Sequence, residues 1–162
     1  GETIMTTNAM SDYLELTLIN HIFRGTSFTQ PTDIYIALCS GVPVDANTAA
    51  STVGGSQGIA ATIPDLMPHA SGGTAGGYTR IAAGRSNSDW DAPTSAGGDT
   101  ENTNAITFAT ATSNWGHVSG IALCDDKWGG NVLMYGALDA VRVVNSGDVF
   151  KFNAGAIDIT FA

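Results

Sequence analysis

Residues 33–41 read DIYIALCSG, and residues 117–130 read HVSGIALCDDKWGG. In the first stretch, apolar side chains at every second position give the period-two pattern of a strand with one buried face. Both stretches contain the letters IALC followed by polar turn residues, and the four shared letters are too few to indicate a duplication. We therefore predict two buried strands, each ending in a cysteine that behaves as a small apolar side chain. The sequence leaves open whether Cys39 and Cys124 lie close enough for a disulfide.

Short apolar runs recur through the rest of the chain, separated by turns rich in Gly, Asn and Asp. These runs are residues 78–83, 105–110, 118–124, 131–138, 140–144, 149–152 and 156–161. Many short strands without alternating helices are typical of an antiparallel β-sandwich. We predict a mainly β fold, with about eight strands forming a single domain over residues 1–162.

One segment, residues 12–24 (DYLELTLINHIFR), predicts an N-terminal α-helix. Asp12 and Glu15 form a capping box, and Gly25 follows the last turn as a stop signal. The apolar side chains form a stripe at helical spacing, made of Leu14, Leu18, Ile19, Ile22 and Phe23. We expect the helix to pack against another surface through this stripe.

Three segments lack a clear pattern of regular structure. Residues 1–11 are predicted to be an N-terminal arm. Residues 41–77, which contain eight glycines, and residues 84–104, which are polar and acidic, are predicted to be long surface loops. Loops of this length are usually functional or are ordered by a partner, so all three segments are candidates for contacts with neighbouring proteins.

The charge balance excludes some classes of partner. Six basic and fifteen acidic residues give a net charge of −9, and the basic residues do not cluster. Nucleic-acid binding requires positive charge that displaces counterions from phosphate, so we predict no nucleic-acid partner. No apolar run reaches the ~20 residues of a membrane span, and an anionic membrane surface would repel this chain.

Several patterns superficially suggest chemistry. GGSQG at 54–58 matches a nucleophile elbow centred on Ser56, but such an elbow requires an α/β sheet, which this sequence does not predict. The three histidines lack metal-ligand spacing. The acidic residues of one loop, Asp89, Asp91, Asp99 and Glu101, lack the ligand order of an EF-hand. We therefore predict no enzyme activity, no catalytic residue, no cofactor and no metal.

Large apolar residues in loops are candidates for protein contacts. Trp115 leads into a strand and is predicted to cap the core, whereas Trp90 and Trp128 lie in loops and are predicted interface residues. Apolar residues of the arm and the first long loop complete the predicted interface set: Ile4, Met5, Ile63, Leu66 and Met67. Tryptophans in loops also stack on sugars, so a carbohydrate-binding receptor module stays open as an alternative.

The order of several segments resembles small virion proteins of tailed phages that are often labelled tail fibre proteins. The resemblance rests on Tyr13-Leu14-Glu15, His21, Phe23, Pro31, Tyr35 to Leu38, Gly77-Tyr78-Thr79-Arg80 and residues 104–120, 129–138, 146–148 and 152–157. It covers most of the chain, and the clearest departure is a longer segment at 41–76. The resemblance implies a non-enzymatic structural protein located in the virion.

The resemblance leaves the position in the virion open. A fibre shaft usually shows heptads or other repeats, and this chain has none. We therefore expect a capsid decoration (cement) subunit that binds the major capsid protein and stabilises the shell, as a homotrimer or another homo-oligomer. The alternative is a tail fibre or tail-attached adaptor subunit that binds tail proteins.

Overall fold

The computed structural model describes residues 5–43, 75–93, 98–127 and 130–161. In chain order its elements are β1 (Met5–Met10), α1 (Asp12–Arg24), β2 (Tyr35–Cys39), the short 3-10 helix η2 (Ala75–Gly77), β3 (Ile81–Ala82), β4 (Asp99–Glu101), β5 (Ile106–Thr107), β6 (Gly116–Cys124), β7 (Val132–Val144), β8 (Lys151–Phe152) and β9 (Asp158–Thr160). All paired strands are antiparallel. The predicted mainly β fold class, with one α-helix near the N-terminus, is confirmed.

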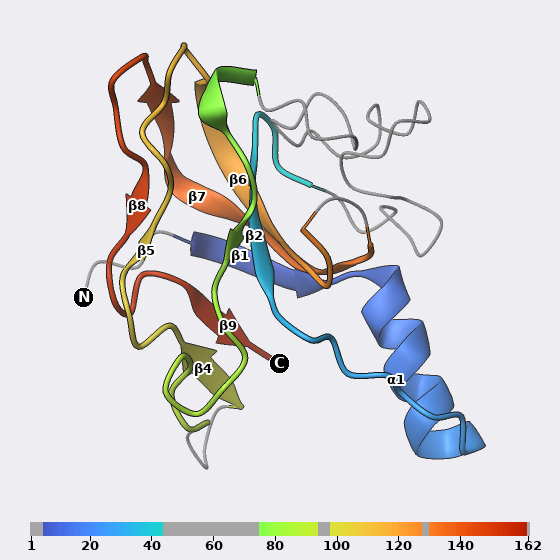
Figure 1. Cartoon of the computed structure of the whole chain (residues 1–162). Coiled ribbons are helices and arrows are strands. Elements are labelled where there is room, and N and C mark those ends of the chain that lie inside the picture. The colour runs from blue at the N-terminus through green and yellow to red at the C-terminus, as the bar shows by residue number, and fades with distance from the viewer. Residues whose placement is uncertain (1–4, 44–74, 94–97, 128–129, 162) are drawn as a thin grey trace.

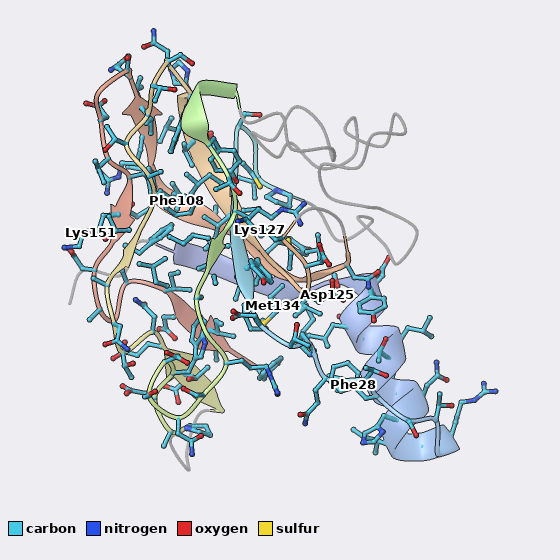
Figure 2. All side chains as sticks on the ribbon, in the orientation of Figure 1. Phe28, Phe108, Asp125, Lys127, Met134 and Lys151 are labelled. Atoms are coloured by element: carbon cyan, nitrogen blue, oxygen red, sulfur yellow. The ribbon has the colours of Figure 1, made fainter. Side chains whose placement is uncertain are left out.

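The strands form one large sheet and two small ones. The large sheet has the order β1-β7-β6-β2-β3, and the small sheets pair β4 with β9 and β5 with β8 (Figure 1). The main core joins side chains of all three sheets. Phe150 contacts Phe108 and Phe152 edge-to-face, with ring centroids 5.9 Å and 5.1 Å apart, and Figure 2 shows Phe108 in the interior.

The two IALC segments are hydrogen-bonded neighbours in β2 and β6, with their alanines directly opposite each other. Their isoleucines and leucines enter the main core, and their alanines and cysteines form a smaller cluster on the other face of the sheet. Cys39 lies opposite Gly120 and Cys124 lies opposite Tyr35, four positions away along the strand pair. Four positions span about 13 Å, beyond the ~4–7 Å between Cα atoms that a disulfide needs. Both cysteines are buried thiols, as predicted.

Three boundaries differ from the sequence prediction. Residues 5–10 of the predicted arm form strand β1 at the sheet edge, and residues 132–144 form one strand, β7, where we predicted two. The ladder with β6 is irregular between Ala137 and Arg142 and continues beyond Asp139 to Val144. The predicted loop 84–104 contains β4, and Trp90 forms a β-bridge with Asn102.

The cap of α1 is Ser11 and not Asp12 as we predicted. The Ser11 Oγ accepts a hydrogen bond from the Leu14 N–H at 3.2 Å and donates to the carbonyl of Val132 in β7. Ser11 is fully buried, so the sheet and the helix are joined through this side chain. At the other end Gly25 adopts a left-handed conformation and ends the helix, as predicted.

Ser11→Ala is expected to lower the free energy of unfolding by about 1–2 kcal/mol, because it removes the cap and leaves the Val132 carbonyl without this donor. Urea unfolding followed by circular dichroism measures the change. The exposed Ser27, just after the helix, offers a control, since Ser27→Ala is expected to change stability by less than about 0.5 kcal/mol. Equal losses in the two variants would contradict the proposed cap.

Candidate interaction surface

Helix α1 projects from the β body and contacts it mainly through its first turns (Figure 1). Leu14 is the only residue of the helix that is buried, and Tyr13 and Leu18 are partly buried against the core. The chain returns alongside the helix through Phe28, whose ring centroid lies 6.5 Å from that of His21 (Figure 2). The C-terminal half of α1 therefore stands out from the body.

The outer side of α1 is apolar and exposed. We call Leu16, Ile19, Ile22 and Phe23 the α1 stripe; their exposed fractions are 58%, 53%, 66% and 79%. Spacings of three and four residues bring these side chains to one side of the helix. Full burial of each such side chain stabilises by roughly 1.5–3 kcal/mol, so a partner that covers the α1 stripe would gain substantial binding energy.

An apolar cleft of about 230 Å³ lies beside the base of α1. Its lining residues are Leu14, Ile34, Arg85, Trp90, Thr100, Leu123, Leu133, Met134, Ile159 and Phe161. Arg85 donates to the Gln30 side-chain oxygen at 3.0 Å, and the other lining residues are almost all apolar. Small-molecule sites usually measure ~300–1,000 Å³, so the apolar cleft better suits one or two protein side chains.

Acidic residues line a hollow on the other face of the β4–β9 pair from this cleft. We call Asp91, Asp99, Glu101 and Asp158 the acidic hollow; Thr100 lines both the hollow and the apolar cleft. Four carboxylates in one place favour a basic partner group. In the described part of the chain no three His, Cys, Asp or Glu side chains are grouped as metal ligands, and the Asp89 carboxylate instead accepts from the backbone N–H and the hydroxyl of Ser86.

Of the predicted interface residues, only Trp90 is placed with its side chain. It is half-buried against the core, donates its indole N–H to the Gly84 carbonyl at 3.0 Å, and lines the apolar cleft. The backbone of Met5 pairs with Leu138 in the sheet. The remaining predicted interface residues, Ile4, Ile63, Leu66, Met67 and Trp128, lie outside the described residues, as does Ser56.

Trp115 caps the core, as predicted. Its indole packs edge-on against Tyr78 at 5.2 Å between centroids and donates to the Gly76 carbonyl at 2.7 Å. Tyr78 accepts the Leu38 N–H at 2.8 Å, and buried Arg80 donates to the Asp126 carbonyl at 2.8 Å. The Gly77–Arg80 motif therefore holds three parts of the fold together.

The prediction that the helix packs through its whole apolar stripe is wrong in part, because only the first turns of α1 contact the body. Leu14 and Leu18 pack against the core, whereas Ile19, Ile22 and Phe23 of the predicted stripe are exposed. One signal in the sequence for an uncovered apolar side of the helix is Leu16, which lies off the predicted stripe. Together with Leu14 and Leu18, it indicates more apolar helix surface than one contact with the body can cover. The apolar cleft has no signature in the sequence, because its walls come from segments far apart in the chain.

Comparison with known proteins gives one family. A family model described as "Podophage GP4 fiber I protein gp80" matches residues 9–160. No curated protein matches the chain. Within the described residues, no helix is long and apolar enough to cross a membrane.

Proposed function

Because the chain belongs to the family of the podophage GP4 fiber I protein gp80, and is therefore a fibre-type structural protein of a phage virion, we propose that it is a non-enzymatic subunit of a tail fibre. The match includes α1 and every strand except the first part of β1. The resemblance noted in the sequence is thus confirmed at the level of the family. The match over residues 9–160 is the observation that carries the proposal.

The structure supports a role as a domain that attaches to other virion proteins. The β body supplies a packed frame, and α1 presents an apolar face away from it. Exposed apolar patches that are rimmed by polar residues mark protein contact sites. We assign the α1 stripe as the main docking element of this subunit within the fibre.

Capsid decoration, our first expectation from the sequence, is not confirmed, and the family favours the tail fibre alternative. The absence of heptads and repeats argued against a fibre shaft. It does not argue against a compact domain at the end of a fibre or at its attachment point. Such a domain needs only a rigid body and one docking face.

The proposal predicts a low copy number at a tail-proximal site. Quantitative mass spectrometry of purified particles is expected to give a few to a few dozen copies per particle, and gold-labelled antibody is expected to mark the tail region. A wild-type particle stripped of its tail fibres is the control and should lose the label. Hundreds of copies, or label distributed over the capsid, would refute the tail fibre role and support decoration.

A further inference from the structure

The segment that leads towards β4 lines a further hollow of about 440 Å³, which we call the Trp90 pocket. Its lining residues are Arg85, Ser86, Asn87, Trp90, Asp91, Ala92 and Pro93, and it lies beside β4 (Figure 1). Trp90 and Arg85 also line the apolar cleft, so the two hollows are neighbours. Small-molecule sites usually measure ~300–1,000 Å³ and combine aromatic side chains with a few polar groups. The Trp90 pocket has the size and the composition of such a site.

Hydrogen bonds and packing fix the walls of the Trp90 pocket. Trp90 packs against the core and donates its indole N–H to the Gly84 carbonyl at 3.0 Å. The Asp89 carboxylate fills the space where a Cβ on Gly84 would stand, which closes the turn between them. The Asp91 N–H donates to the Glu101 carbonyl of β4 at 2.9 Å. A pocket with fixed walls loses little conformational entropy when a ligand binds.

Three polar side chains of the pocket keep hydrogen-bonding capacity that the fold does not use. In the part of the chain that the structure describes, the Asn87 amide and the Asp91 carboxylate make no hydrogen bond, and both residues are exposed. Arg85 uses one guanidinium N–H for the Gln30 side-chain oxygen, and a guanidinium carries several more donors. Donors and acceptors therefore stand next to an aromatic side chain.

A pyranose ring matches this combination. One face of the ring consists mainly of C–H groups, which pack on the negatively charged face of an aromatic side chain. Its hydroxyls both donate and accept hydrogen bonds, so they pair with amide and carboxylate groups. The charges of Arg85 and Asp91 balance, and an anionic ligand would also meet a chain with a net charge of −9. The pocket therefore favours a neutral sugar over an acidic sugar or a nucleotide.

We propose that the Trp90 pocket binds a neutral pyranose ring of a carbohydrate, which stacks on Trp90 while its hydroxyls bond to Asn87 and Asp91. The sequence left a carbohydrate-binding role open for tryptophans in loops, and the pocket assigns that role to Trp90. The inference goes beyond the fibre role and stands on the pocket alone. It gives the chain a ligand site that shares no residue with the α1 stripe.

Nuclear magnetic resonance of the isotope-labelled full chain tests this proposal. The probes are the methyl pyranosides of glucose, galactose, mannose and N-acetylglucosamine, and at least one is expected to shift the Trp90 indole N–H signal saturably. Asn87→Ala and Asp91→Ala are each expected to weaken that binding about 10-fold, because each removes a hydrogen bond to the sugar. Both residues are exposed, so both variants should fold like the wild type.

The matched control is Asn145→Ala, which removes an exposed amide outside the Trp90 pocket and should leave sugar binding unchanged. The absence of a saturable shift with any of these pyranosides up to about 50 mM would overturn the proposal. Unchanged binding in both pocket variants, or equal weakening by Asn145→Ala, would overturn it too. Binding of adenosine monophosphate or of the methyl glycoside of sialic acid, in place of the neutral sugars, would show that the ligand class is wrong.

The outcomes for sugar binding and for the fibre role are separate. Sugar binding that follows the expected pattern, in a chain that is absent from tail fibres, would overturn the fibre role alone. A chain that is found in tail fibres and binds none of the sugars would overturn the proposed ligand site and leave the fibre role intact.

Discussion

Asn102→Asp is expected to destabilise the protein by about 3–5 kcal/mol, because it places a carboxylate where the fold requires an N–H donor. Asn102 is buried, and its side-chain amide donates to the carbonyls of Asn104 and Asn153 at 2.7 Å and 2.8 Å. Its side-chain oxygen accepts from the Ile157 N–H at 2.8 Å. An aspartate keeps the acceptor and loses the donor, so two carbonyl oxygens would face a buried negative charge.

The loss of the Asn102 hydrogen bonds is also expected to disturb the strands that line the candidate interaction surface. Asn102 follows β4 and holds the segment that leads to β9, and these strands carry three residues of the acidic hollow and Ile159 of the apolar cleft. Urea unfolding at neutral pH measures the loss of stability. Asn153→Asp is the matched control, since its side chain is exposed and its replacement should cost less than about 0.5 kcal/mol. A loss below about 1 kcal/mol for Asn102→Asp would show that the amide is not required.

The strands of the sheet were predictable because their information is local. The apolar run of residues 34–39 predicted a buried strand, and β2 is buried on both faces. The observed bounds of α1, Asp12–Arg24, agree with the helix predicted from apolar spacing and from the stop signal at Gly25. In these segments local propensity and the final packing agree, so the pattern alone is sufficient.

Other features depend on contacts between distant segments. Strand β1 has the sequence MTTNAM, which lacks clear alternation, and it is a strand because its backbone completes the edge of β7. The hydrogen bond from the Ser11 hydroxyl to the Val132 carbonyl, which ties the start of α1 to β7, has no local signal. The apolar cleft likewise exists only where α1, the large sheet and β9 meet. Periodicity showed that α1 has an apolar face, but only the structure shows which part of that face the body covers.

The double variant Ile19→Gln/Phe23→Gln is expected to lower the copy number in particles by more than about 30-fold, because it removes two anchors of the α1 stripe. Glutamine is a good helix former, and both residues are exposed, so the helix and the free energy of unfolding should change little. The variant is supplied during infection by a phage that lacks the gene, and its copies in purified particles are counted by quantitative mass spectrometry.

The matched control for this variant is Val141→Thr/Val143→Thr, which makes two similarly exposed apolar residues of β7 more polar and keeps their β-branched shape. Particles with normal copy number for the control and very few copies for the helix variant would identify α1 as the docking element. Normal incorporation of the helix variant would show that attachment to the fibre uses another surface. Because α1 contributes only Leu14 fully to the core, the experiment separates attachment from folding more cleanly than any change within the β body could.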